Sequence, residues 1–356
     1  MEGPLTGTVI VDASRMLPGA VLDRLALDLG ATVAKVEDPT AGDPLRHAPP
    51  LDPESGVGAA FASLCRGAES VCLDLREEAG AASLRRMCRH ADVLVESFRP
   101  GTMEGWGLGW ERMMAVNPGL IYLSMSGYGH TGPDRDAVGH DLNFTASSGL
   151  LSLFPPGMPR LPVSDIAGGV LGLTALLAAL LERSRTGRGR FLDQPLSAAS
   201  APFLAWPLAD LAAGGGGLGE DMLSGRCPAY RLYAGSDGRE IAVCCLEPKF
   251  WDAFLKEVGL PDLAGAALER GEVGAAAAAR IAQAIARRPA AWWTERFRVL
   301  GLPVSPVRDL EAVRSLALAG GAGVGFPFPA LLASYGRPGA GPVPRLGEHT
   351  ARWTGG

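Results

Sequence analysis

The sequence lacks cysteine pairs at the C-x-x-C spacing typical of zinc and redox sites. Its six cysteines lie mostly in apolar or strand-like surroundings, which predicts buried thiols in a reducing cytoplasm. It also lacks a basic excess, because 33 Lys and Arg stand against 38 Asp and Glu, giving a formal net charge of −5. We therefore expect no nucleic-acid partner, although a few local arginines would suffice for a phosphate-bearing ligand.

Targeting and membrane segments are not expected either. The N-terminus has no basic segment followed by a long apolar stretch, which excludes a typical signal peptide. The longest apolar stretch, residues 166–181, contains glycines and is flanked by Asp165 and Glu182. It is shorter than the roughly 18 to 20 residues that cross a bilayer. We interpret it as a buried helix and predict a cytoplasmic protein without a membrane segment.

Apolar strands alternate with helical segments in the first half of the chain. Strand-like runs cover residues 8–14, 32–38, 70–75, 92–98 and 120–126, and helical spacing covers 18–30 and 76–91. The first of these helices begins with Pro18 and ends at Gly30, as helices commonly do. This alternation predicts an α/β fold with a parallel, doubly wound sheet.

A change of composition at residues 212–217, AAGGGG, predicts a flexible connection to a second part of the chain. Two strand-like runs within residues 230–245 then flank a Ser-Asp-Gly turn, which is typical of a hairpin. Helical segments follow at 248–260, 273–288 and 290–300. We predict a large domain over 1–212 with a C-terminal return over 320–356, and a small α+β domain over 218–319.

One glycine motif is weak evidence for the dinucleotide-binding loop that its sequence pattern suggests. Gly127, Gly129 and Gly132 form G-x-G-x-x-G after a predicted strand, as in dinucleotide-binding loops. Such loops also need a helix directly afterwards and an acidic residue about 20 positions on, and both are missing. We interpret this segment as a strand-to-loop turn and do not expect His130 within it to act as a base.

Three other residues are candidates for acid–base chemistry. His140 precedes a helical run, and the plain alternative is that Asp141 caps that helix while His140 is incidental. Asp165 opens an apolar helix, where it is a favoured cap, but free N–H groups and a positive dipole there would also hold an anion. Glu247 precedes Pro248 at a strand–helix junction and has no obvious capping role.

Together an imidazole and two carboxylates would make an acid–base site. Gly168 and Gly169, after Asp165, would let a ligand approach the backbone closely.

Several stretches, in order along nearly the whole chain, resemble the family III CoA-transferase and α-methylacyl-CoA racemase superfamily, also called the CaiB/BaiF group. They are VIVDASRMLPGAVLDRLALDLGATVAKVE, ADVLVESFRPGTMEGWGLGWE, NPGLIYLSMSGYGHTGP, VGHDLNF, PVSDIAGG, ERSRTGRGRFLD, PAYRLYAGSDGREIAVCCLEPKFW and GEHT. The resemblance implies a Rossmann-like large domain, a smaller domain and an interlocked homodimer. It also implies a CoA thioester substrate with no prosthetic group and no metal, bound where the large domain of one subunit meets the small domain of the other.

Two chemistries occur in this superfamily. In transferases, the aspartate matching Asp165 attacks the acyl-CoA and forms a mixed anhydride and then a thioester. In racemases, this aspartate works with a histidine in a Gly-His-Asp motif, which here is Gly139-His140-Asp141, and Glu247 stands in a racemase-like L-E-P context.

The resemblance thus favours a racemase or epimerase of 2-methyl-branched acyl-CoA. His140 and Asp165 would serve opposite faces of an enolate, Glu247 would orient His140, and Asp141 would assist. Backbone N–H groups near Asp165 would hold the enolate. A CoA-transferase with Asp165 as nucleophile is the main alternative, and a non-catalytic CoA-binding protein is a lesser one.

Positions for binding CoA also follow from the resemblance. Arg99 matches an arginine that meets the CoA phosphates, and the segment from Gly139 to Phe144 surrounds the thioester. The adenine would lie against Leu73, Asp74 and Leu75.

The sequence departs from the superfamily at the nucleotide. Cys65 and Ala68 stand where many relatives have Asn and Lys, and Asp38 stands where racemases commonly have Arg. We expect nearby cations to compensate, namely Lys35, Arg46 and Arg66. A carrier-protein phosphopantetheine arm, which has no adenine, remains an alternative acyl carrier.

Overall fold

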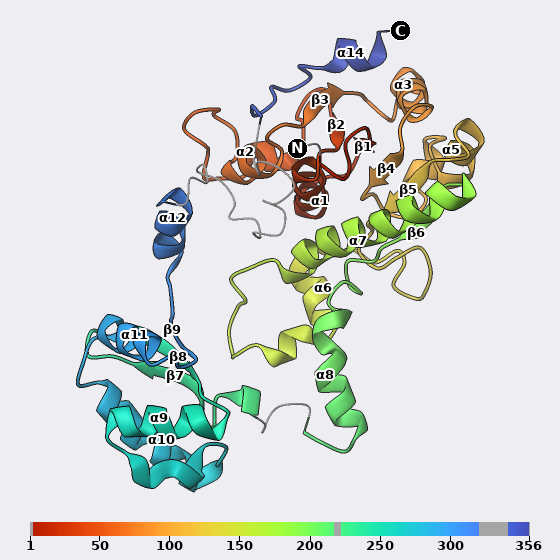
Figure 1. Cartoon of the computed structure of the whole chain (residues 1–356). Helices are drawn as coiled ribbons and strands as arrows, with labels where there is room; N and C mark the ends of the chain where they lie inside the picture. Colours follow the sequence, from red (N-terminus) through yellow and green to blue (C-terminus); the bar gives the residue numbers. More distant parts are fainter. Residues whose placement is uncertain (1–2, 217–221, 320–340, 356) are drawn as a thin grey trace. The chain divides into compact units, whose positions relative to one another are not determined.

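The computed structural model describes residues 3–216, 222–319 and 341–355, and the chain divides into two compact units (Figure 1). Unit 1 comprises Met1–Phe203 and Ala317–Gly356, and unit 2 comprises Leu204–Leu316. Helix α8 (Ala201–Ala212) begins in unit 1 and ends in unit 2, so the division lies before the predicted boundary at residue 212.

Unit 1 is built on a six-stranded parallel sheet in the order β3-β2-β1-β4-β5-β6. The strands are β1 (Val9–Asp12), β2 (Thr32–Glu37), β3 (Glu69–Cys72), β4 (Val93–Glu96), β5 (Ile121–Ser124) and β6 (Arg190–Asp193). This order is that of a Rossmann-like doubly wound sheet, which confirms the predicted fold class. Only β6 was not predicted, because this edge strand has charged, exposed ends and no apolar run.

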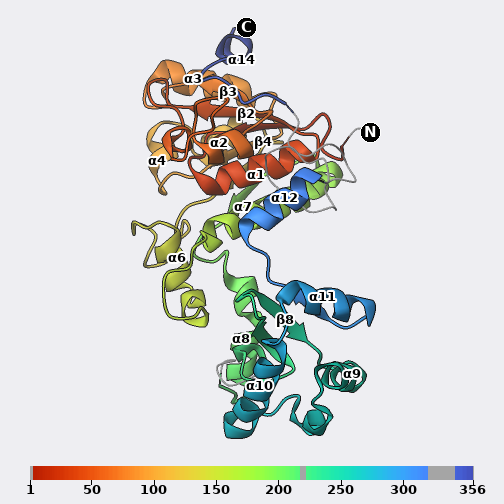
Figure 2. The ribbon, with the colours of Figure 1, turned by 90° about the vertical axis from the view of Figure 1, so that its left-hand side faces the viewer.

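Neighbouring strand residues point to opposite faces, and helices cover both (Figures 1 and 2). Ile10 packs on the first face and Val11 on the second. The first face is covered by α1 (Leu17–Asp28), α2 (Ala59–Leu64) and α7 (Val163–Thr186). The second is covered by α3 (Glu78–Cys88), α4 (Thr102–Gly105), α5 (Trp110–Val116) and α14 (Thr350–Thr354).

Glycines on α7 let it lie directly against α1 and the sheet (Figure 2). A Cβ atom added to Gly169 would lie 2.6 Å from the Pro18 carbonyl oxygen, and one on Gly168 would lie 2.4 Å from Leu196 Cδ2. These glycines therefore serve close packing between elements, and the expectation that they admit a ligand is wrong.

Helix α7 is longer than predicted. It has 24 residues and is long and apolar enough to cross a membrane by length and composition alone, with 44% of its most apolar window buried. The face carrying Leu173 and Leu176 is buried in unit 1, whereas Ile166 and Leu181 are exposed. The prediction of a buried helix thus holds for one face of α7.

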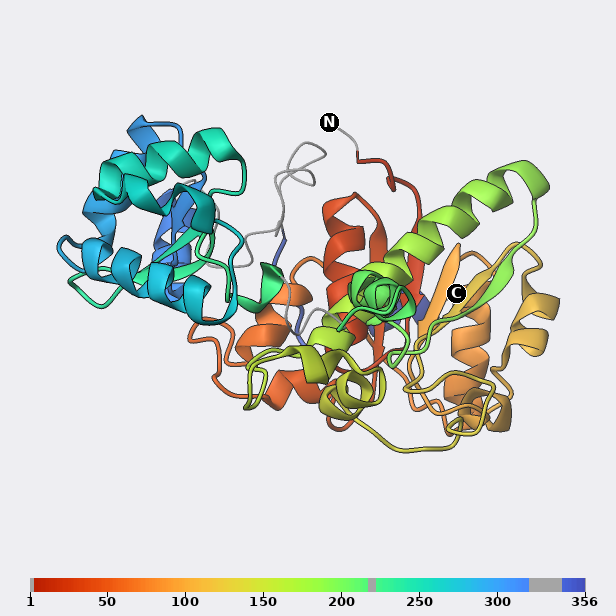
Figure 3. The ribbon, with the colours of Figure 1, turned by 90° about the horizontal axis from the view of Figure 1, so that it is seen from below.

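Unit 2 contains a three-stranded antiparallel sheet formed by β7 (Tyr230–Ala234), β8 (Glu240–Cys244) and β9 (Val304–Pro306). The predicted hairpin is confirmed by the pairing of β7 with β8. Helices α9 (Pro248–Val258), α10 (Gly271–Ile285) and α11 (Ala290–Val299) pack around this sheet (Figure 3). Stacked aromatic pairs fill the core between them, such as Trp293 and Phe297 at 5.3 Å.

The described end of the chain lies along β3. The His349 backbone N–H donates to the Ser70 carbonyl at 2.9 Å, and Trp353 Nε1 donates to Glu69 at 2.6 Å. These contacts cover the β3 edge of the sheet in unit 1. The remaining part of the predicted return, residues 320–340, lies outside the described residues.

A buried ion cluster joins the ends of β1 and β2. Lys35 Nζ lies 2.7 Å from Asp12, 3.4 Å from Asp43 and 3.7 Å from Asp23, and all four side chains are at most 1% exposed. Burial, together with the Asp12 charge, raises the pKa of Asp23 well above its usual range, so Asp23 keeps a proton. Despite burial, the adjacent Lys35 ammonium lowers the pKa of Asp12, so these two residues form a charged pair within the cluster.

We predict that Lys35→Met lowers the free energy of unfolding by about 3–5 kcal/mol, because removal of one partner leaves buried charge uncompensated. Urea unfolding followed by circular dichroism measures the change. A matched control is Arg314→Met, which removes an exposed cation paired with Glu311 and should leave the midpoint unchanged. Equal midpoints for Lys35→Met and the wild type would contradict a structural role for the cluster.

Candidate active site

Two cavities lie at the carboxyl edge of the unit 1 sheet, where the strand order reverses between β1 and β4. Ligands of doubly wound sheets bind at such a reversal, because the loops after the two strands diverge there. The first, lined by His140 and Asp165 and named the His140 cavity, has a volume of about 210 Å³. The second, lined by Leu73 and Trp106 and named the Trp106 cavity, has a volume of about 280 Å³. Both are lined by Arg15, after β1, and Phe98, after β4, so a single elongated ligand could extend from one into the other.

Three predicted catalytic-region residues line the His140 cavity, namely Gly139, His140 and Asp165. His140 is the N-cap of α6 (Asp141–Ser147), and its backbone N–H donates to Asn143 Oδ1 at 3.1 Å. A Cβ atom on residue 139 would lie 2.9 Å from the Phe144 ring, so only glycine fits before the histidine without displacement. The His140 side chain is exposed at the cavity.

Asp141 does not cap α6 but connects it to α7. Asp141 Oδ1 accepts the backbone N–H of Asp165 at 2.9 Å. Beside this bond, the hydroxyl of Ser164 lies 2.9 Å from those of Thr145 and Ser200, and all three side chains are buried. The bond from the Asp165 N–H to Asp141 satisfies one of the N–H groups at the start of α7 that have no partner within the helix.

Two of the backbone N–H groups near Asp165 are already bonded within the protein, and the enolate-binding role expected of the start of α7 stays a prediction. The Asp165 N–H is bonded to Asp141, and the Ile166 N–H donates to the Pro162 carbonyl at 3.2 Å. The positive end of the α7 dipole still faces this region.

Burial, and after it the Asp141 charge, raises the pKa of Asp165 to about 7. Near neutral pH, the carboxyl group is consequently present in both its protonated and its ionised form. A group with this property can both accept and return a proton, as a general acid–base catalyst requires.

Arginines gather around the His140 cavity. Arg99 and Arg15 are exposed there and Arg135 is half-buried, and a contact between Arg99 and the CoA phosphates stays a prediction. Sequence reasoning missed Arg15, although its place directly after the first strand puts it at the carboxyl edge of the sheet.

The turn carrying Arg15 is held in an unusual backbone conformation. The next residue, Met16, has φ 66°, a region that non-glycine residues seldom occupy. The backbone N–H of Met16 donates to Asp43 Oδ2 at 3.2 Å, and the backbone N–H of Arg15 donates to Ser97 Oγ at 2.9 Å. These bonds from the ion cluster and from the loop after β4 stabilise the turn.

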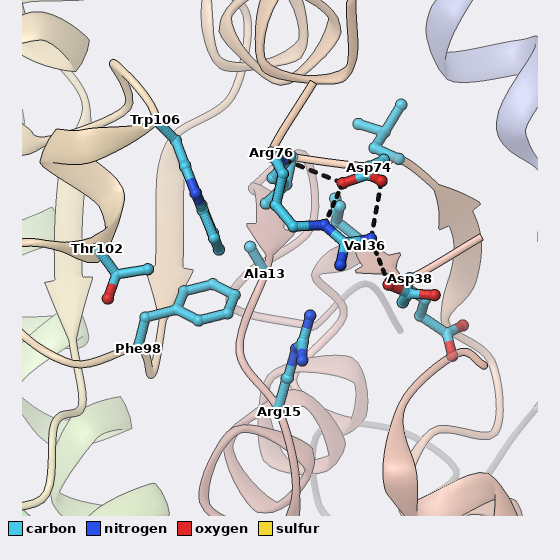
Figure 4. A pocket seen from close by; sticks show the side chains of 12 residues that line it. Ala13, Arg15, Val36, Asp38, Asp74, Arg76, Phe98, Thr102 and Trp106 are labelled. Carbon is cyan, nitrogen blue, oxygen red and sulfur yellow. Dashed lines mark hydrogen bonds and ion pairs between the residues drawn. The ribbon is translucent and has the colours of Figure 1, made fainter. Parts of the chain in front are cut away.

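Leu73, Asp74 and Leu75 line the Trp106 cavity (Figure 4). The Phe98 and Trp106 rings meet edge to face at 5.0 Å on its opposite side. Arg76 bonds to Asp74 through Nε at 2.8 Å and lies 3.4 Å from Asp38. The cavity therefore combines an apolar and aromatic surface with a charged rim.

Other predicted ligand contacts lie elsewhere. The prediction for Lys35 is wrong, because its ammonium is buried among three carboxylates. Arg46 is likewise buried against Glu37, with Nε 2.6 Å from Oε2. Arg66 lines neither cavity and donates to the Gly341 carbonyl at 3.3 Å.

Glu247 belongs to unit 2, where it is the exposed N-cap of α9 ahead of Pro248. The His140 cavity is lined by unit 1 alone, so a contact between Glu247 and His140 stays a prediction. Within the described ranges, no group of three or more His, Cys, Asp or Glu side chains could hold a metal ion.

The glycine motif has the structural role that was predicted. The Gly127–Gly132 segment leads from β5 into a loop, and the next helix, α6, begins only at Asp141. The His130 ring nitrogen lies 2.8 Å from Ser124 Oγ, and its ring packs edge-on against Phe191 at 5.1 Å. These contacts give His130 a structural role, in which its side chain packs at the end of β5.

Comparison with known proteins connects this site to a family. The model of CoA-transferase family III matches residues 5–324. The acetyl-CoA:oxalate CoA-transferase of Acetobacter aceti is 31% identical, over 98% of this chain and 95% of its own length. The α-methylacyl-CoA racemase of Mus musculus is 32% identical, over 97% and 91% respectively.

A solved structure of a CaiB/BaiF family protein from Brucella suis has a TM-score of 0.86 and 28% identity, covering 99% of this chain and 98% of that one. Both the sequence and the fold match over almost their full length. The chain therefore belongs to CoA-transferase family III, which comprises both transferases and racemases of CoA thioesters.

Proposed function

We propose that this protein is a racemase or epimerase of 2-methyl-branched acyl-CoA thioesters. The observation that carries the proposal is that His140 and Asp165 line one cavity, with the pKa of Asp165 raised to about 7. An imidazole and a carboxyl group of this kind are suited to exchanging a proton with a weak carbon acid.

The reaction needs one base on each face of the α-carbon. One base removes the α-proton, and the electron pair of the C–H bond moves to the thioester carbonyl oxygen, giving a planar enolate. The conjugate acid of the other base then donates a proton to the opposite face, and the carbonyl re-forms. His140 and Asp165 take these two roles in turn, depending on the starting stereoisomer.

The two cavities, which share Arg15 and Phe98 in their linings, support a CoA-linked substrate. The acyl group and thioester would occupy the His140 cavity, the phosphates would meet Arg99 and Arg15, and the adenosine would occupy the Trp106 cavity. Glu247 orienting His140 in an interlocked homodimer, and a cytoplasmic location, are part of the same proposal.

A CoA-transferase is the second candidate, and a specific observation favours it. The Acetobacter aceti relative that matches nearly the whole chain is a CoA-transferase. In that reaction Asp165 would attack the thioester carbonyl, and the CoA thiolate would leave to give an acyl anhydride. The half-buried carboxyl group at the start of α7 is compatible with this role, but only proton transfer has a use for His140.

We predict that the wild type incorporates deuterium from D₂O at the α-carbon of a 2-methylacyl-CoA. His140→Ala should lower racemisation by about 10²- to 10⁴-fold, the usual contribution of a general base. Proton NMR follows the exchange. The matched control is His90→Ala, which removes an exposed imidazole that lines neither cavity. No deuterium incorporation into any branched acyl-CoA would refute the proposal.

The pH dependence should follow the raised pKa of Asp165. From the enantiomer whose α-proton faces Asp165, only the ionised carboxylate can remove the proton. We therefore expect the initial release of α-deuterium from that enantiomer to rise with pH and to level off above an apparent pKa of about 7. A rate that is constant between pH 6 and pH 8 would mean that Asp165 is not the base.

Hydroxylamine distinguishes the two candidates. A racemase forms no acyl bond to the protein, so incubation with acyl-CoA and hydroxylamine should leave the intact mass of the protein unchanged. In a transferase, an anhydride on Asp165 would yield a hydroxamate at that residue, which peptide mass spectrometry detects. Asp165→Asn is the control for the position of any adduct.

A further inference from the structure

The Trp106 cavity presents two contrasting surfaces (Figure 4). One is apolar, with leucine side chains on one side of the cavity and the Phe98–Trp106 ring pair opposite them, and it suits a flat group such as a purine. The other is the rim, where Asp38 and Asp74 lie on either side of Arg76. Carboxylates accept hydrogen bonds from hydroxyl groups but repel phosphates.

Asp38 is fixed in its ionised form directly after β2. Its Oδ1 accepts the backbone N–H groups of Thr40 at 2.9 Å and Ala41 at 3.1 Å. These bonds lower the pKa of Asp38, with Arg76 as a smaller cause. In doubly wound sheets, an acidic residue after the second strand binds free ribose hydroxyls, whereas an arginine nearby accommodates a ribose phosphate.

The nearest cation on the rim is already engaged. Arg76 contacts both oxygens of Asp74 at 2.8 Å and reaches Asp38 at 3.4 Å, so one guanidinium serves two carboxylates. Arg15 also lines the other cavity, with its guanidinium carbon 5.2 Å from the centre of the Phe98 ring. From that junction it can meet the phosphates between the adenosine and the thioester.

We propose that Asp38 makes the Trp106 cavity a site for adenosine with free ribose hydroxyls, so that thioesters of 3′-dephospho-coenzyme A bind at least as tightly as those of coenzyme A. This inference rests on the proposed function, since it assumes a nucleotide-linked thioester. Coenzyme A differs from the dephospho form by a phosphate on the 3′-hydroxyl. That phosphate removes a hydrogen-bond donor and brings negative charge towards Asp38.

Calorimetric titration of the full chain with coenzyme A and with 3′-dephospho-coenzyme A tests the proposal. In the wild type, the dephospho form should bind as tightly as coenzyme A or more tightly. Asp38→Arg should move the ratio of the two dissociation constants by about tenfold or more towards coenzyme A. Asp38→Asn, which keeps an acceptor oxygen but no charge, should move the ratio in the same direction by less.

The matched control is Glu111→Arg, which makes the same change of charge at an exposed position of α5 outside both cavities. This variant should keep the wild-type ratio. A wild type that binds coenzyme A ten times more tightly than the dephospho form would overturn the inference, as would a folded Asp38→Arg protein with an unchanged ratio. In that case Arg15 or Arg76 takes the 3′-phosphate.

Deuterium exchange on the same preparation separates this inference from the proposed function. If a 2-methylacyl-CoA exchanges its α-proton but coenzyme A binds far more tightly than its dephospho form, the inference about Asp38 alone is wrong. If the ratio is as expected but no branched acyl-CoA exchanges, the inference about the nucleotide holds and the racemase proposal fails.

Discussion

The ion pairs between Lys35 and its buried carboxylates hold together the segments at the carboxyl edge of the unit 1 sheet. Asp12 ends β1, Lys35 lies on β2, and Asp43 precedes the short helix at Pro44–His47, so one ammonium holds three segments together. Asp43 also accepts the N–H of Met16. The turn that places Arg15 at both cavities thus depends on the buried ion pairs of Lys35.

The fold was predictable because its signals are local. Strands such as β1 and β5 are short apolar runs between turn residues, and α1 is marked by Pro18 and Gly30. The short strand β6 escaped because only its place beside β5 makes it a strand. The role of Gly169 escaped for a similar reason, since its neighbour Pro18 is far away in sequence.

The site was predictable in part. His140 and Asp165 line one cavity as the resemblance implied, but no pattern of spacing could show that Asp141 would bond to the Asp165 backbone rather than cap its own helix. Lys35 was misjudged because a cation near the end of a strand looks the same in sequence whether it faces a ligand or buried carboxylates. Such pairings depend on residues that only the tertiary fold brings together.

Asp141 combines two tasks in one side chain. It holds the start of α7 beside α6, which carries His140, and its charge contributes to the raised pKa of Asp165. A neutral acceptor at this position would keep the geometry while removing the charge, so Asp165 would ionise at lower pH. Position 141 is therefore a place where evolution or design can shift the pH at which Asp165 ionises without replacing His140 or Asp165.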